Sequence, residues 1–96
     1  MQKFAYLRRH YQTNFLWDQT TVAALVTIAA REDFTPTSDI LEAPGIVVAQ
    51  QCVLRKCRDL EAEGFVVGDP ACRPHTPQRF KATHLGKEAV KILEEN

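Results

Sequence analysis

Residues 55–67 read RKCRDLEAEGFVV, a charged stretch that stops at a glycine and continues into an apolar run. Four apolar residues ahead of the glycine share one helical face, because they are spaced by four, four and three: Ala49, Val53, Cys57 and Leu60. Gly64 favours the left-handed conformation that ends helices. The β-branched Val66 and Val67 then favour a strand. The stretch therefore predicts a helix that ends at Gly64 and leads directly into a strand.

The chain before this junction predicts three further helices. Residues 3–11 and 14–31 have apolar residues at helical spacing. A short helix over residues 36–43 is expected to begin at Thr35-Pro36, where the hydroxyl can cap free N–H groups and proline needs none. Pro44-Gly45 ends it and turns the chain toward the long helix.

The chain after the junction predicts a β-hairpin and a last helix. Residues 65–69 and 79–84 are strand-like, with Phe80 and Ala82 on one face and Arg79 and Lys81 on the other. A proline-rich loop, residues 70–78, separates them. Thr83 is placed to cap a final helix.

This order predicts a mainly α fold with a small β-hairpin, the winged helix-turn-helix. We expect residues 1–96 to form a single winged-helix domain. Its parts would be an N-terminal helical arm (1–13), a helical core with the helix-turn-helix (14–64), a wing (65–84) and a C-terminal helix (85–96).

Composition is that of a folded chain with no overall charge bias. Among 96 residues, 45% are hydrophobic and 25% charged, which argues against disorder, and the formal net charge is zero. The charges are nevertheless segregated. Residues 1–16 and 65–82 have a basic excess, whereas residues 17–48 have an acidic one. A nucleic-acid-binding protein usually has a basic excess overall, so the neutral net charge leaves a protein as an alternative binding partner.

Nothing in the sequence predicts export or membrane insertion. The N-terminus is polar and charged, and the apolar run at residues 22–30 is too short to span a bilayer. Three cysteines are an odd number, which favours free thiols in a reducing cytoplasm.

Two segments resemble a known family. CRDLEAEGFVV and RFKATHLGKEAVKIL are similar to the corresponding stretches of MarR-type winged-helix transcription regulators, and more distantly of PadR-type ones. Those proteins have Leu-Glu-x-x-Gly-Leu-Val at the end of the long helix, matched by residues 60–66, and Leu-Thr-x-x-Gly before the last helix, matched by residues 82–86. The resemblance covers roughly residues 17–93 and implies a DNA-binding regulator that acts as a homodimeric repressor.

The sequence also departs from that family. The segment APGIVVAQQ, residues 43–51, is longer and more apolar than the usual approach to the long helix. Only residues 1–13 and the last helix are available for the dimer arms, and only Arg73 and Arg79 represent the arginine-rich wing tip.

Residue types on the long helix suit base recognition, since glutamine can pair with adenine and arginine with guanine. Hydroxyl groups at the short helix suit phosphate, and basic wing residues suit the DNA backbone. The predicted DNA-binding residues are Thr35, Thr37, Ser38, Gln50, Gln51, Arg55, Arg58, Arg73, His75, Arg79 and Lys81. The alternative for the helix is an ordinary solvated polar face, and the alternative function is a winged-helix adaptor that binds protein without DNA.

One short helix contacts too few bases for tight specific binding, so we expect a homodimer on a pseudo-palindromic operator. The predicted interface is Phe4, Leu7, Tyr11, Leu85, Ile92 and Leu93, with packing inside one protomer as the alternative.

No catalytic, metal or cofactor site is predicted. Cys52 and Cys57 point about 140° apart on a helix and cannot share one metal, and Cys72 with His75 supplies only two ligands. No glycine-rich phosphate loop or catalytic pair is evident, so an enzyme is not expected.

Overall fold

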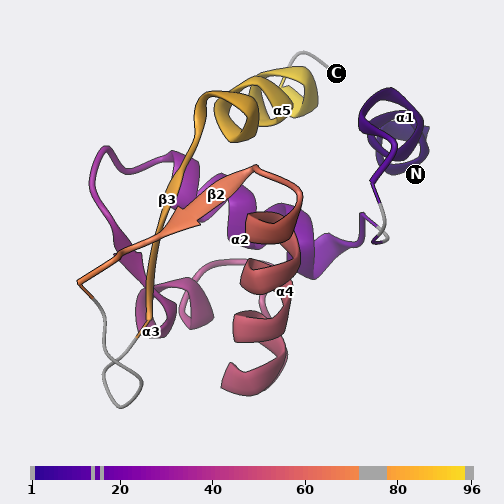
Figure 1. Ribbon diagram of the computed structural model, residues 1–96. Coiled ribbons are helices and arrows are strands. Elements are labelled where there is room, and N and C mark those ends of the chain that lie inside the picture. The colour runs from indigo at the N-terminus through magenta and orange to yellow at the C-terminus, as the bar shows by residue number, and fades with distance from the viewer. Residues whose placement is uncertain (1, 14, 16, 72–77, 95–96) are drawn as a thin grey trace.

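The computed structural model describes residues 2–13, 15, 17–71 and 78–94. Within those ranges the chain is mainly helical with one small sheet, which confirms the predicted fold class. The elements are α1 (Gln2–Tyr11), α2 (Gln19–Ala29), β1 (Thr35–Pro36), α3 (Thr37–Leu41), α4 (Gln50–Ala62), β2 (Val66–Gly68), β3 (Arg79–Ala82) and α5 (His84–Glu94) (Figure 1).

Helix α2 is the centre of the molecule, since it packs against α3, α4, α5 and β3. It is shorter than the predicted helix over residues 14–31. Asp18 explains its start: the side chain adopts the N-cap position and accepts a 2.8 Å hydrogen bond from the Thr21 N–H. The buried Leu25 and Ile28 confirm the predicted apolar stripe.

The sheet has three antiparallel strands in the order β1-β3-β2, whereas the sequence predicted a two-stranded hairpin. The additional strand is Thr35–Pro36, which pairs with Phe80 and Arg79 of β3. These two residues were expected to begin the short helix, and the structure corrects that expectation. A residue before proline is disfavoured in the helical region, and Pro36 itself is extended, so the pair suits a strand edge and α3 begins only at Thr37.

The helix-to-strand junction forms as predicted. Gly64 has φ +88°, and the Phe65 N–H donates to the Leu60 carbonyl over 2.9 Å, which closes the end of α4. Thr83 caps α5, because its hydroxyl oxygen accepts from the Gly86 N–H at 3.2 Å. The same hydroxyl donates to the Gly64 carbonyl at 2.6 Å. The start of α5 is therefore hydrogen-bonded to the end of α4.

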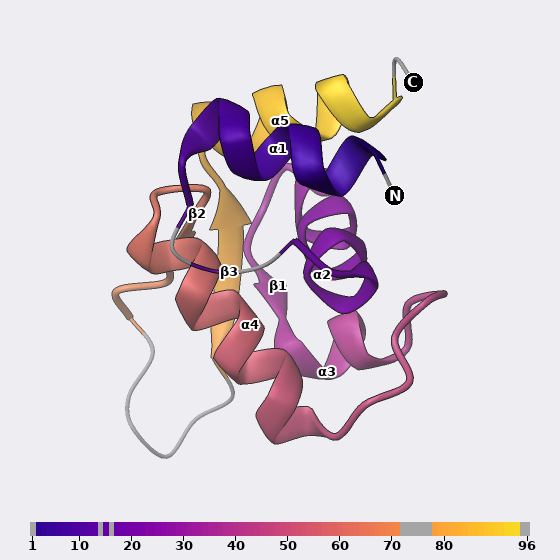
Figure 2. The same cartoon turned by 90° about the vertical axis from the view of Figure 1, so that its right-hand side faces the viewer.

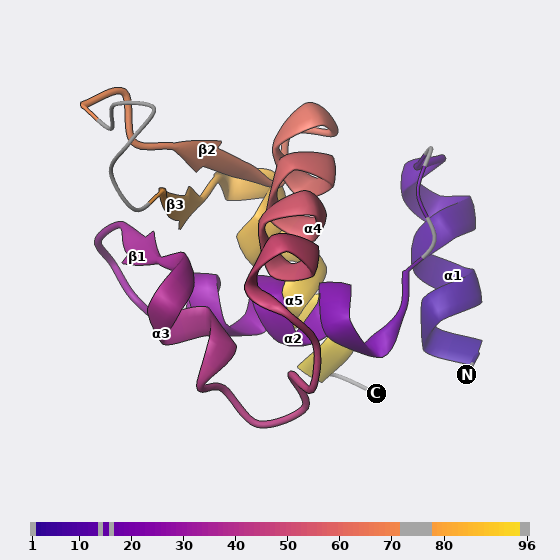
Figure 3. The same ribbon diagram turned by 90° about the horizontal axis from the view of Figure 1, so that it is seen from below.

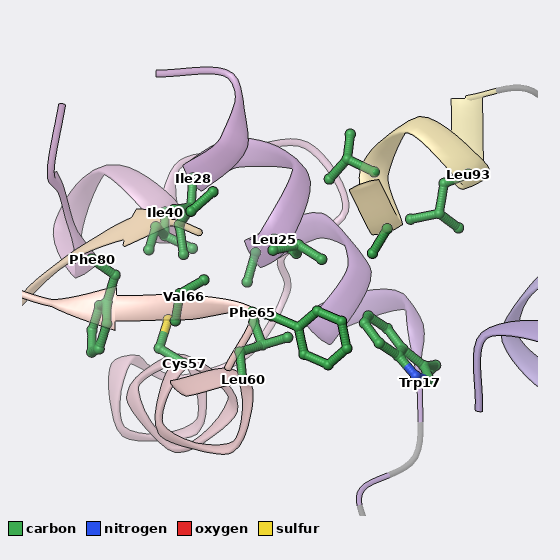
Figure 4. Close-up of a cluster of buried hydrophobic side chains, with 14 of the residues drawn as sticks. Trp17, Leu25, Ile28, Ile40, Cys57, Leu60, Phe65, Val66, Phe80 and Leu93 are labelled. Carbon is green, nitrogen blue, oxygen red and sulfur yellow. The ribbon is translucent and has the colours of Figure 1, made fainter. Parts of the chain in front are cut away.

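The core lies between α2, α4 and the sheet, and Figure 4 shows Phe80 and Phe65 on either side of Val66 within it. Phe65 is also the centre of an aromatic group. The rings of Tyr11 and Trp17 each lie 5.1 Å from it, nearly perpendicular, and Phe15 lies 6.3 Å away. Trp17 is thus a core residue.

The two ends of the molecule carry different elements. Figure 2 shows α3 and the start of α4 at one end, with α1 and α5 at the other. Figure 3 looks onto the first end and shows the loop between α3 and α4 in front, while α1 stands at the edge. A surface at the start of α4 is therefore remote from α1 and α5.

Candidate nucleic-acid interface

The outer face of α4 is a polar stripe. Gln51, Arg55 and Arg58 are exposed and recur at intervals of four and three, so they line one side of the helix. The opposite side holds the buried residues Val53, Cys57 and Leu60. Val53, Cys57 and Leu60 lie on the inner face as predicted, whereas Ala49, expected on the same face, is the exposed N-cap. The stripe faces away from the core.

The first turn of α4 is open to a partner. Ala49 is the N-cap and makes no side-chain capping hydrogen bond, and the turn contains no acidic residue. Gln50 beside it is exposed. The first N–H groups of a helix lack intrahelical acceptors and carry the positive end of the helix dipole, which favours a negatively charged neighbour.

The loop before α4 and the first nine residues of α4 carry only basic charge, whereas Asp59 and Glu61 lie in the last part of the helix. Residues 43–58 contain no acidic residue but include Arg55, Lys56 and Arg58. Lys56 binds Asp18 over 2.7 Å, so its charge is compensated. Arg55 forms no ion pair or hydrogen bond with any residue that the structure describes. Arg55 is therefore the cation best placed to bind an external anion.

Arg58 connects α4 to the sheet instead of pointing freely into solvent. Its guanidinium donates to Glu61 Oε1 and to Gln78 Oε1, each over 2.8 Å, and lies 5.2 Å from the centre of the Phe80 ring. The second carboxylate oxygen of Glu61 accepts from the Gly68 N–H at 3.0 Å. We call these residues the wing brace. Sequence reasoning missed it because Gln78 and Phe80 follow Arg58 by about twenty positions.

The basic residues of β3 also have partners. Arg79 forms an ion pair with Asp69, and the Lys81 ammonium lies 5.8 Å from the centre of the Phe34 ring. Phe80 and Ala82 are buried while Arg79 is exposed, as the alternation predicted. The other predicted wing residues, Arg73 and His75, lie outside the described residues, as does Cys72.

Two of the three hydroxyl residues predicted to meet phosphate are inaccessible. Thr35 is 0% exposed and Thr37 is 3% exposed, and the Thr37 N–H already donates to the Gln78 carbonyl over 3.1 Å. A buried side chain cannot reach a phosphate, so this corrects the expectation for both Thr35 in β1 and Thr37 in α3. Ser38 is exposed and stays available.

Some of the residues predicted to form the dimer interface are buried in the core, and others are partly exposed. Leu7 is fully buried within the protomer and Leu93 nearly so, which matches packing inside one chain and corrects their assignment to a free surface. Tyr11, Leu85 and Ile92 are half-buried. The side chain of Phe4 lies outside the described part of the chain.

Two titratable groups are strongly shifted by their surroundings. Burial raises the pKa of the Cys57 thiol to about 12, so it stays protonated and acts as a small core residue. Burial, with the Glu88 carboxylate nearby, raises the pKa of Tyr11 to about 12. Neither group titrates near neutrality, and neither lies on the outer stripe of α4.

The described residues contain no group of three or more histidine, cysteine or acidic side chains that could hold a metal ion. None of the helices in the described ranges is long and apolar enough to cross a membrane. A surface hollow of about 150 Å³ is lined by Phe15, Asp59, Ala62 and Glu63, well below the volume of most small-molecule sites.

No family model matches the sequence, and comparison with curated proteins gave no match. Solved structures do match in fold. The MepR–DNA complex from Staphylococcus aureus has a TM-score of 0.72 at 16% identity, over 98% of this chain and 75% of that one. ZitR from Lactococcus lactis in complex with DNA has a TM-score of 0.65 at 12% identity, over 86% and 54%. A MarR-family regulator from Silicibacter pomeroyi has a TM-score of 0.66 at 21% identity, over 98% and 60%.

The last two structures are considerably longer than this chain, which spans 54% and 60% of them. At sequence identities of 12% to 21%, the likeness to these structures shows the fold of this chain and not its function. The helix-turn-helix made by α3 and α4, the three-stranded sheet and the α5 junction agree with that fold. This chain has a winged-helix fold, similar to that of the MarR-family structure.

Proposed function

We propose that the protein is a sequence-specific, double-stranded DNA-binding transcription regulator. The observation that carries the proposal is the exposed stripe of α4, whose three residues lie in the acid-free segment 43–58 and which presents Arg55, unpaired among the residues that the structure describes. Arginine binds the guanine edge bidentately in the major groove, and glutamine binds adenine in the same way. The likeness to regulators solved with DNA supports this use of the fold.

The charge pattern supports DNA over a protein partner. Phosphate attraction depends on the local field at the surface that meets DNA, and residues 43–58 carry basic side chains and no acid although the net charge of the chain is zero. The three exposed stripe residues are polar, whereas a protein-docking helix would present an apolar face. A protein adaptor remains the competing function, and the experiment below separates the two.

The contacts follow from exposure. We propose that Gln50, Gln51 and Arg55 reach bases, and that Ser38 meets the phosphate backbone. Arg79, Lys81, Arg73 and His75 are proposed as wing contacts. Arg58 has the separate task of holding the wing against α4, since both of its hydrogen bonds and its ring contact are internal.

We propose a homodimer acting as a repressor in the cytoplasm, on a pseudo-palindromic operator. A 13-residue helix covers only about 20 Å, too little for tight specific binding by one copy. Helices α1 and α5 lie at the end of the molecule opposite the start of α4, so pairing there leaves both α4 helices free (Figure 2). Tyr11, Leu85 and Ile92 remain candidates for that interface.

The test is selection of duplexes from a random DNA pool by the purified protein, followed by affinity measurement across a salt series. Specific binding should weaken steeply with salt, because each neutralised phosphate releases a counterion. Arg55→Ala should weaken binding to the selected site by about 1–3 kcal/mol while thermal stability stays unchanged. Arg8→Ala, which removes the same charge from α1, is the control and should change affinity little.

If the protein binds no duplex even at low salt, the proposal of a DNA-binding regulator is refuted, and a protein-binding adaptor becomes the better interpretation. Loss of fold in Arg55→Ala would instead contradict the exposed position of that side chain.

A further inference from the structure

The loop between α3 and α4 has an unusual composition for an exposed turn. Residues 43–49, APGIVVA, contain no polar side chain, whereas surface turns are commonly built from polar residues. Within it Val47 is 92% exposed. The other exposed valines, Val26 at 37% and Val67 at 46%, are less exposed and belong to α2 and β2. Val47 therefore presents a nearly complete isopropyl group to solvent.

The position of Val47 is fixed by its neighbours. Ile46 is buried and its N–H donates to the Ala43 carbonyl over 3.2 Å, while Val48 is half-buried. Gly45 has φ +90°, and a Cβ built on it would lie 3.5 Å from the Ala23 Cβ, so the turn runs near α2. Ile46 and Val48 on either side are thus turned at least partly toward the protein, whereas Val47 between them is exposed.

Val47 lies beside the surface proposed to meet DNA. Val47 lies three positions before Gln50, the first residue of α4, so the two Cα atoms are at most about 11 Å apart. The major groove is about 12 Å wide, so when α4 begins in the groove, Val47 lies within about one groove width of the first bases that α4 meets. Figure 3 shows this loop and the start of α4 together at the near end of the molecule.

The chemistry of the groove then selects a partner for an isopropyl group. The bases offer hydrogen-bonding atoms on their major-groove edges, and the thymine 5-methyl is the apolar group among them. We propose that Val47 is a specificity-determining residue, packing against the methyl group of a thymine next to the bases that α4 contacts. This inference rests on the proposed function and adds to it a base preference that no hydrogen-bonding residue supplies.

A protein partner is the competing explanation for an exposed valine. The surroundings disfavour it, because the exposed residues that follow are Gln50, Gln51 and Arg55, and residues 43–58 contain no acid. The exposed apolar side chains beside Val47, those of Pro44 and Ala49, are small, and the next exposed valines lie on other elements.

The experiment measures the affinity of the wild type and variants for the selected duplex and for duplexes with one thymine at a time replaced by deoxyuridine. Deoxyuridine keeps every hydrogen-bonding atom and loses only the methyl group. At one thymine in each half-site, wild-type affinity should fall about fourfold, the effect of burying one methyl-sized group. Val47→Ala should bind the thymine duplex at least about fourfold more weakly and should no longer distinguish thymine from deoxyuridine there.

Val26→Ala is the matched control, because it makes the same deletion at an exposed valine on α2. It should keep the wild-type preference for thymine. Thermal denaturation of both variants shows whether the fold is intact.

Three outcomes separate the two proposals. If no duplex is selected from the pool, the proposal that the protein is a DNA-binding regulator is overturned. Specific binding in which Val47→Ala keeps the full thymine preference overturns the methyl contact and leaves the regulator standing. A change in oligomeric state of Val47→Ala, measured by analytical ultracentrifugation, also overturns it, because the valine would then contact another protein chain.

Discussion

The most direct test of the fold is Gly86→Ala at the start of α5. A Cβ on residue 86 would lie 2.1 Å from the Phe65 carbonyl oxygen and 3.1 Å from its carbon. The nearest atom is backbone and cannot swing aside as a side-chain end could. That carbonyl also accepts the Thr83 N–H over 3.0 Å, so relieving the contact displaces the junction between the sheet and α5.

The size of the effect follows from three contributions. Forcing an extra carbon into a packed site costs about 1–3 kcal/mol. Weakening the hydrogen bond from Thr83 costs about 1 kcal/mol more. Replacing glycine by alanine in a helix returns up to about 1 kcal/mol. We therefore expect Gly86→Ala to lower the free energy of unfolding by about 2 kcal/mol, or the melting temperature by about 8–16 °C for a domain of this size.

Urea denaturation followed by circular dichroism gives the free energy, provided the transition is two-state. Gly68→Ala is the matched control. Its Cβ would lie 2.8 Å from Glu61 Oε2, the end of a side chain that can move, so it should cost clearly less. A Gly86→Ala protein as stable as the wild type, or one less destabilised than Gly68→Ala, would falsify the close approach of α5 to Phe65.

Three further predictions concern single contacts. Partial burial would raise the pKa of Asp18, but hydrogen bonds from Lys56 and from the Thr21 N–H lower this pKa below 3.8 in the folded protein. The ionised Asp18 therefore stabilises the fold above pH 3.8, and this stabilisation is lost as the pH falls through the lowered pKa of the folded state. Asp18→Ala should thus be about 1 kcal/mol less stable at pH 7 in denaturant melts, with the difference shrinking in acid. Cys52 should react with a thiol reagent in the native protein and Cys57 only on unfolding, because Cys57 is buried and burial raises its pKa to about 12. Equal labelling of Cys52 and Cys57 in the native protein, measured by peptide mass spectrometry, would contradict this. Arg58→Ala should speed hydrogen exchange at the Gly68 amide severalfold, because Glu61 loses the partner that holds its carboxylate; unchanged exchange measured by NMR would refute the wing brace.

Local rules predicted the parts of the fold that depend on neighbours in the sequence. Gly64 ends α4 because few other residues tolerate φ +88°, and Thr83 caps α5 because its hydroxyl lies three residues before a free N–H. The inner face of α4 followed from spacing alone. The mainly α class and the winged arrangement came from the order of these elements.

Long-range pairing accounts for what the sequence did not predict. Thr35 has the chemistry of a helix cap, yet it pairs with Phe80, a partner 45 positions away that no local pattern identifies. Arg58 has the spacing of an exposed stripe residue, but its hydrogen bond to Gln78 exists only once the wing folds back. The polar face of α4 was likewise expected from its residue types, whereas the exposure of Val47 could be seen only in the structure.

The hydroxyl of Thr83 donates to the Gly64 carbonyl and accepts from the Gly86 N–H, so one side chain joins the chain at the end of α4 to the start of α5. A displacement of the start of α5 would therefore act directly on the end of α4. If two copies were joined through α5, this hydrogen-bonded connection would couple the spacing between their α4 helices to the joint. A small rotation at the joint would then become a larger displacement at the far end of α4.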